Sequence, residues 1–192
     1  MNYYVYKMIF NTGVHLGNGS ILDAEKTFEA DRLFSALCIE AKNKYGVTGI
    51  ENLYNMVIKD EIRFSDGFPF VDEDLFLPKP FIQVEGVDKQ GDSGEKKAFK
   101  KLKYVSMDKY DEFIQGKLNP KTENEKLKNL GFAKMRTNVA IDKLDEPSPY
   151  SVGEYRFSNE TYYDQDKKNR NEIVQVVGIY FILGYEKEED AE

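Results

Sequence analysis

The chain has 192 residues, of which 41% are hydrophobic and 14% aromatic, so it can bury a core and is not a disordered protein. Its formal net charge of −7 argues against nonspecific coating of nucleic acid, because such binding neutralises many phosphates with lysine and arginine; any RNA site must be a local patch. The single cysteine excludes an internal disulfide or a thiolate metal cluster. The lack of a membrane-length apolar run or a leader peptide predicts a cytoplasmic protein with no membrane partner.

The first predicted element is a strand over residues 3–10. It is rich in aromatic and β-branched residues and carries one charge, so we expect it at the centre of a sheet. In the glycine-rich loop that follows, Gly13, Gly17 and Gly19 surround the only histidine, His15. Glycines let a backbone approach a ligand closely and point its N–H groups at it, which suits phosphate groups.

An amphipathic helix gives the strongest periodic signal in the chain. Its apolar residues recur at the i, i+3, i+4, i+7 spacing of one helix face: Ala30, Leu33, Phe34, Leu37, Cys38 and Ala41. Thr27 is placed to cap its N-terminus, Asp31 lies in the first turn, and Gly46 is placed to end it. Cys38 is predicted to be a core residue rather than a reactive thiol.

A second helix and two short strands are predicted next. Thr48 and Glu51 form a capping-box pattern ahead of a helix that ends near Lys59. Residues 62–70 and 75–77 then predict short strands separated by turn residues.

From residue 83 to 131 the composition shifts to glycine, aspartate and lysine, which predicts an insertion. We expect two short helices inside it, at 107–115 and at 123–130, the second opened by Thr122. The lysine run between residues 96 and 103 is expected to be solvated.

The remaining elements are predicted to be strands. Residues 133–142 alternate, with Lys134, Arg136 and Asn138 on one wet face and apolar residues on the other. Residues 154–157 and 161–163 predict a short hairpin. The apolar run 173–183 predicts a strand covered on both faces, or covered by a helix on one face and by a partner on the other.

This order of elements predicts an α+β protein, compatible with a ferredoxin-like βαββαβ sheet that carries helices on one face. We expect one domain over residues 1–184, with the insertion at 83–131, and an acidic tail over 185–192.

Motifs for common chemistries are missing from the sequence. It has no Walker loop, GxGxxG, CxxC, HExxH or GxSxG motif, and one histidine cannot build a triad or a multi-histidine metal site, so we expect no cofactor and no metal. His15 can still act alone as a general acid or base on RNA, although a loop histidine between glycines more often orders its loop or stacks on a base. Asp23 and Asp31 are explained by loop solvation and by helix position.

Several stretches carry a family resemblance. The strand YYVYKMIF, the G-x-H-x-G loop and the helix segment F-x-A-D-R-L-F-S-A-L are similar to the start of a RAMP protein from type III CRISPR effector complexes. FPFVDEDLFLPKPF and MRTNVAID, in that order, are similar to stretches of the fourth subunit of Csm-type complexes and of its Cmr-type cousin. The resemblance runs nearly end to end. It implies a ferredoxin-like (RRM/RAMP) domain whose insertion forms a thumb that reaches the guide RNA, and it implies that this chain corresponds to the first half of family members.

The resemblance further implies a noncatalytic subunit that binds the 5′ repeat-derived tag of crRNA and docks the large Cas subunit and the RAMP backbone subunit. The predicted RNA-binding residues combine the glycine loop with basic and amide side chains: His15, Gly17, Gly19, Arg32, Lys134, Arg136 and Asn138. Two alternatives remain. One is a RAMP endoribonuclease that processes guide RNA with His15, since related enzymes use an early histidine, and the other is a scaffold that binds only protein.

Overall fold

The computed structural model describes residues 1–17, 19–82, 93–141, 147–163 and 171–186. The chain forms two compact units. The first contains Met1–Met8, Thr27–Phe68 and the strand residues from Ile179 onward, and the second contains Ile9–Lys26 and Pro69–Gly178. The expected single domain over 1–184 stays a prediction, and the acidic tail beyond residue 186 lies outside the described residues.

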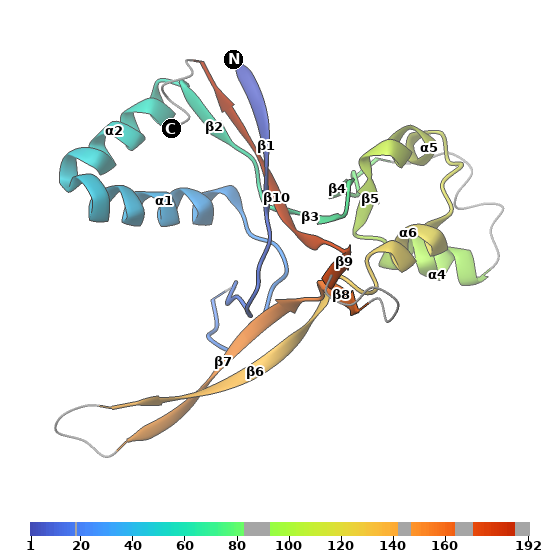
Figure 1. Cartoon of the computed structure of the whole chain (residues 1–192). Helices are drawn as coiled ribbons and strands as arrows, with labels where there is room; N and C mark the ends of the chain where they lie inside the picture. The colour runs from blue at the N-terminus through green and yellow to red at the C-terminus, as the bar shows by residue number, and fades with distance from the viewer. Residues whose placement is uncertain (18, 83–92, 142–146, 164–170, 187–192) are drawn as a thin grey trace. The chain divides into compact units, whose positions relative to one another are not determined.

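The first unit contains three strands and two helices: β1 (Asn2–Met8), α1 (Ala30–Tyr45), α2 (Val47–Ile58), β2 (Ile62–Phe64) and most of β10 (Val177–Tyr185). β10 lies between β1 and β2 and runs antiparallel to both, so β1 and β2 run parallel to each other. Helices α1 and α2 connect β1 to β2 (Figure 1). The rings of Phe34 and Phe64 lie 6.5 Å apart where α1 meets β2.

Burial distinguishes the two long strands of this sheet. β10 is mostly buried, and Ile179 and Tyr180 have no exposed surface, which confirms a strand covered on both faces for this part of the apolar run. In the described part of the chain β1 is the end strand of the sheet, and Tyr3 and Tyr4 are 61% and 50% exposed. The predicted central position of residues 3–10 is therefore wrong, because β10 takes that place.

The period predicted for α1 is confirmed, but its cap is not. All six predicted apolar-face residues are half-buried, and most residues between them are exposed. Glu29 occupies the N-cap position without a capping side chain, and Asp66 Oδ1 accepts a hydrogen bond from Ala30 N at 2.8 Å. The prediction that Thr27 caps α1 is therefore wrong, because the carboxylate of Asp66, which is distant in sequence, accepts the hydrogen bond from the first turn.

One glycine separates the two helices. Gly46 ends α1 as predicted, since its N–H donates to Lys42 O and its φ of 71° favours glycine. It is also the N-cap residue of α2. The capping box predicted at Thr48 and Glu51 is wrong, because the helix has already begun at Val47.

After residues 9–26, the second unit continues with most of β3, two further short strands and several short helices. Their bounds are β3 (Phe68–Val71), β4 (Asp74–Pro78), α4 (Ser93–Lys101), β5 (Tyr104–Ser106), the 3-10 helix η1 (Met107–Lys109), α5 (Tyr110–Ile114) and α6 (Pro120–Lys126). β4 pairs antiparallel with β3 and with β5. The lysines of α4 are exposed as expected, but the helix itself was not predicted. We call the described residues from β4 to Leu130 the lobe.

The lobe encloses its own apolar core. Five of its apolar side chains are at most 2% exposed: Phe76, Leu102, Val105, Phe113 and Leu130. The buried carboxylate of Glu123 accepts hydrogen bonds from Ser106 N and Ser106 Oγ, both at 2.9 Å, and its other oxygen lies 3.3 Å from Lys126 Nζ. Burial opposes the charge of Lys126, but Glu123, Asp74 and Asp108 outweigh that effect and raise the pKa of Lys126. Polar and apolar contacts together therefore hold α6 against β5.

Helix α6 begins three residues before its predicted start. Asn119 Oδ1 accepts hydrogen bonds from Lys121 N and Thr122 N, so Asn119 is the cap and the prediction of Thr122 is wrong. Pro120 follows at the first helical position, where its missing N–H costs nothing.

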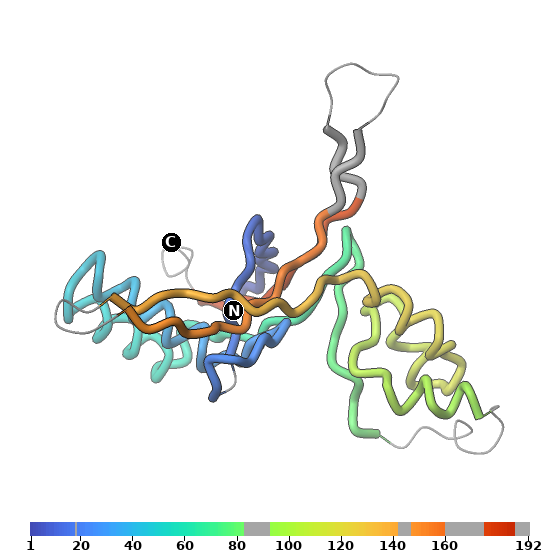
Figure 2. Tube along the Cα trace, turned by 90° about the horizontal axis from the view of Figure 1, so that it is seen from below, coloured from blue at the N-terminus to red at the C-terminus, as the bar shows by residue number. Residues whose placement is uncertain are grey.

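Two antiparallel strand pairs complete the second unit: β6 (Gly131–Ala140) with β7 (Ser148–Phe157), and β8 (Glu160–Tyr163) with β9 (Asn171–Gln175). Figure 2 shows β6 and β7 running side by side as a long ribbon. The predicted hairpin of 154–157 with 161–163 is wrong, because 154–157 belongs to β7. Met135 and Val139, predicted to face a core, are 51% and 53% exposed, because this ribbon is two-stranded in the described chain.

Candidate nucleic-acid interface

The glycine-rich loop lies along the edge of β7. Val14 and Tyr155 form an antiparallel bridge in which Val14 N donates to Tyr155 O at 2.9 Å and Tyr155 N donates to Val14 O at 2.8 Å. Farther along the strand, Gly153 N donates to Ile21 O at 2.8 Å. Residues that are distant in sequence therefore share one surface at this edge.

Gly153 makes the close approach of loop and strand possible. A Cβ atom at this position would collide with the carbonyl oxygen of Leu22 and would lie 2.6 Å from that of Asp23. His15 Nδ1 lies 2.7 Å from Gly153 O. Any residue larger than glycine would push the loop, and His15 with it, away from β7.

The contact with Gly153 assigns the tautomer of the neutral His15 ring. A carbonyl oxygen can only accept, so Nδ1 carries the hydrogen and Nε2 is the acceptor nitrogen. Glycine at position 17 leaves room for the ring, because a Cβ there would lie 2.8 Å from His15 Nε2. The geometry thus gives His15 a clear role in ordering the loop.

The ribbon has a basic face and a largely apolar face. Residues opposite each other in the register share a face, which places Phe132, Lys134, Arg136 and Asn138 with Tyr150, Val152, Glu154 and Arg156. Phe132 and Tyr150 are 51% and 43% exposed on this face. Basic side chains interleaved with exposed aromatic rings can bind phosphates and stack on bases.

A cleft of about 470 Å³ forms where this face meets the loop. Its lining comes from the loop and from both strands: Thr12, Gly13, Lys134, Met135, Arg136, Thr137, Glu154 and Arg156. Glycine at position 13 leaves space for the Glu154 side chain, because a Cβ there would lie 2.6 Å from Glu154 Oε2. Arg136 Nη1 lies 3.1 Å from Glu154 Oε1, and this carboxylate side chain is only 14% exposed.

The charges of the cleft leave a net positive site. Glu154 neutralises Arg136, whereas Lys134 and Arg156 form no ion pair within the described ranges. Two cations beside backbone amides and a hydroxyl-bearing residue, Thr12, match the groups that bind a phosphodiester backbone. The cleft can therefore hold a phosphate group.

The structure brings together only part of the predicted RNA-binding set. His15 lies in the loop, and Lys134 and Arg136 line the cleft. Asn138 lies farther along β6, opposite Tyr150, and Gly19 has the positive φ of 95° that favours glycine. Gly17 adjoins the His15 ring. Arg32 belongs to the first unit, so the structure does not group it with this cleft. The RNA-binding role of these residues stays a prediction.

The sequence analysis named Gly13 as part of the ligand-approaching loop, but it missed Gly153, Glu154 and Arg156 of this surface. The alternation of residues 150–157 carried a signal, because Val152, Glu154 and Arg156 lie two apart. Assigning 154–157 to a hairpin with 161–163 hid the pairing of Glu154 with Lys134.

Within the described residues, no group of three or more histidine, cysteine or acidic side chains converges as a metal site. Among the helices described, none is long and apolar enough to cross a membrane.

The chain is similar to known proteins of one kind. It is 31% identical over 173 residues to a protein described as CRISPR system Cms protein Csm4 from Streptococcus thermophilus, covering 84% of this chain and 52% of that protein. It is 28% identical over 158 residues to a protein of the same description from Mycobacterium tuberculosis (strain CDC 1551 / Oshkosh), covering 82% and 50%. The chain thus spans about half the length of the curated relatives it matches. No family model matches it.

Solved structures share the fold. A chain of a Csm1-Csm4 cassette in complex with AMPPNP gives a TM-score of 0.58 at 19% identity, over 96% of this chain and 60% of that one. A chain of a Csm3-Csm4 subcomplex in the type III-A CRISPR-Cas interference complex gives 0.51 at 17% identity, over 100% and 60%.

Proposed function

This chain is a homologue of the Csm4 proteins of type III-A CRISPR systems over most of its own length, and from that relationship we propose that it binds guide RNA as part of a Csm effector complex. The ligand would be the 5′ repeat-derived tag of crRNA. The partners would be the large Cas subunit and the RAMP backbone subunit, since structures of similar fold are described as Csm1-Csm4 and Csm3-Csm4 assemblies. The first unit would be part of a ferredoxin-like domain.

The cleft between the glycine loop and β6–β7 carries this proposal. A chain with a net charge of −7 cannot hold RNA through its overall charge, so affinity requires a local site. Lys134 and Arg156 supply such a site, and Gly13 lets the backbone approach a ligand. Phe132 and Tyr150 add stacking surfaces on the same face.

We further propose that the subunit is noncatalytic. Cleavage of RNA by one histidine needs a free ring nitrogen beside the 2′-hydroxyl and a second group for the leaving oxygen. His15 already uses Nδ1 on Gly153 O, so one of its two ring nitrogens is committed to holding the loop. This arrangement favours a histidine that orders the loop.

The test is binding of labelled tag RNA at several salt concentrations. The double variant Lys134→Ala with Arg156→Ala should bind more weakly, and its log–log salt slope should fall by about 0.7 for each lost phosphate contact on single-stranded RNA. The control is Lys42→Ala with Lys121→Ala, which removes the same charge from exposed positions outside the cleft. An unchanged slope in the first variant would remove the cleft from the RNA site.

The same incubation separates the two alternative functions. Retention of RNA without shortening supports the proposal. Cleavage that His15→Ala abolishes would establish the endoribonuclease instead. If the protein neither retains nor cleaves the RNA but still binds its partner subunits, it is a scaffold that binds only protein.

A further inference from the structure

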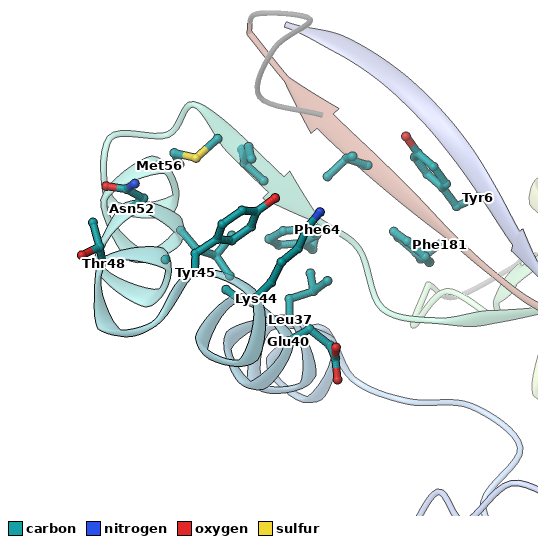
Figure 3. A pocket seen from close by; sticks show the side chains of 15 residues that line it. Tyr6, Leu37, Glu40, Lys44, Tyr45, Thr48, Asn52, Met56, Phe64 and Phe181 are labelled. Carbon is teal, nitrogen blue, oxygen red and sulfur yellow. The ribbon is translucent and has the colours of Figure 1, made fainter. Parts of the chain in front are cut away.

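The cleft differs from the large groove of the first unit because it combines cations with a carboxylate. That groove, of about 740 Å³, is lined mainly by apolar side chains such as Leu37 and Phe181 (Figure 3). The cleft places Glu154 beside Lys134 and Arg156. A carboxylate repels a phosphate group, so Glu154 opposes the binding of RNA unless the ligand gives it a favourable contact.

The backbone around Glu154 is fixed on both sides. Tyr155 exchanges two backbone hydrogen bonds with the glycine loop, and Gly153 N donates a third to the same loop. The loop also covers the side chain, since a Cβ at Gly13 would lie 3.2 Å from Glu154 Cβ. The carboxylate side chain is therefore only 14% exposed and is held in place before a ligand arrives.

One oxygen of this carboxylate remains available to a ligand. Arg136 Nη1 donates to Glu154 Oε1 at 3.1 Å, and among the described residues no donor is hydrogen-bonded to Oε2. Oε2 lies on the side of Gly13, where the missing side chain leaves space next to it. An ionised carboxylate can only accept hydrogen bonds, so Oε2 favours a ligand group that donates one.

The strand register places this acceptor beside the cations that can hold a phosphate. Lys134 lies directly opposite Glu154, and Arg156 lies two residues along β7 on the same face. A phosphate held by these cations brings its own sugar next to the carboxylate. In RNA the carbon beside the one that carries the 3′-phosphate bears the 2′-hydroxyl, which is a hydrogen-bond donor. Donors on the base edges lie farther from that phosphate.

We infer that Glu154 selects RNA over DNA in the cleft by accepting a hydrogen bond from a ribose 2′-hydroxyl at Oε2. The inference rests on the proposed RNA-binding function and adds a specificity-determining residue to it. Deoxyribose has no 2′-hydroxyl, so DNA meets the repulsion of the carboxylate without gaining this contact. Glu154 thus lowers the affinity for a ligand that lacks the donor, and ribose recovers that loss.

The test compares three labelled oligouridylates of equal length, with ribose, 2′-fluoro and 2′-deoxy sugars, by fluorescence anisotropy at one low salt concentration. The 2′-fluoro sugar keeps the pucker of ribose but has no donor, so it separates the hydrogen bond from the sugar conformation. The unaltered chain should bind the ribose form about tenfold more tightly than either of the others, the effect of one hydrogen bond to a charged group.

Two variants separate the hydrogen bond from the charge. Glu154→Ala and Glu154→Gln remove the same charge, but only glutamine keeps an oxygen that can accept. Glu154→Ala should reduce the preference for ribose to less than about twofold and strengthen binding of the 2′-fluoro and deoxy forms, because the repulsion is gone. Glu154→Gln should retain more of the preference. The control Glu51→Ala, which removes an acidic charge from an exposed position on α2, should leave the preference unchanged.

Equal affinity of the unaltered chain for the ribose and 2′-fluoro forms would overturn the inference without any variant. A preference that survives Glu154→Ala would overturn it too, and an equal loss in Glu154→Ala and Glu154→Gln would make the preference an effect of charge instead.

The double variant Lys134→Ala with Arg156→Ala distinguishes these results from a failure of the proposed function. If it weakens binding of all three oligouridylates, the RNA site stays in the cleft and only the role of Glu154 is lost. If it leaves their binding unchanged, or if the unaltered chain binds none of them, both proposals fail.

Discussion

The lobe and the helix layer formed by α1 and α2 use helices in opposite ways. The α-helices of the lobe have five to nine residues, yet the lobe buries Phe76, Phe113 and Leu130 almost completely. Helices α1 and α2 have 16 and 12 residues, and only Gly49 is buried. Length and periodicity therefore show which face of a helix is apolar, but only a packed neighbour on that face buries it.

The comparison also separates two kinds of stability. The lobe has both an apolar core and a satisfied buried carboxylate at Glu123, so its helices depend on contacts within the lobe. The helix layer keeps its apolar side chains beside an open groove. We expect the lobe to resist local unfolding better than the helix layer.

The largest expected effect is a difference between matching core truncations. Phe113→Ala should cost about 3–5 kcal/mol of lobe stability, because it leaves a cavity around a ring that is 2% exposed. Leu37→Ala should cost less than about 1.5 kcal/mol, because that side chain is already half-exposed. Denaturant unfolding, read for each region by hydrogen exchange, measures both.

Equal losses of stability for Phe113→Ala and Leu37→Ala would contradict the difference between the lobe and the helix layer.

The next effect is alkaline unfolding through a buried tyrosine in each unit. Burial raises the pKa of Tyr180 in the first unit and of Tyr155 in the second to about 12, from 10.0. Below pH 10 both phenols are neutral in the folded and in the unfolded chain, so they do not make the stability depend on pH. As the pH rises from 10 to 12 the unfolded chain ionises first, and each tyrosine lowers stability by about 2 kcal/mol.

Tyr180→Phe and Tyr155→Phe should each reduce that loss, as measured by thermal unfolding across this pH range. Tyr54→Phe, which removes a phenol from a side chain 54% exposed, is the control. If the alkaline loss persists in both buried variants, neither tyrosine is its cause.

The smallest effect compares the two helix caps. Asp66→Ala should destabilise α1 and Asn119→Ala should destabilise α6, each by about 1 kcal/mol, because a first-turn N–H loses its acceptor. Asp66→Asn and Asn119→Asp keep an acceptor and should recover most of the loss. Hydrogen exchange at the first turn of each helix measures both pairs, and a cap whose removal leaves exchange unchanged contributes nothing.

The candidate site shows how far sequence reasoning reached. Lys134, Arg136 and the loop around His15 were predicted from alternation and glycine spacing, and the structure places them at one surface. Glu154 and Arg156 were missed because their strand pairing is nonlocal. Arg32 was included in the predicted RNA-binding set because of its position in the first turn of the helix, yet it belongs to the first unit.

The sequence by itself determined the local features of this protein. The 3.6-residue period of α1, its end at Gly46 and the alternation of β6 follow from steric and hydrogen-bonding preferences within a few residues. Only the tertiary structure decided which strand became central, since β1 and β10 are both rich in apolar residues. The cap of α1 was decided in the same way by Asp66. Burial and capping depend on which groups fold against each other, and local periodicity contains no information about such distant contacts.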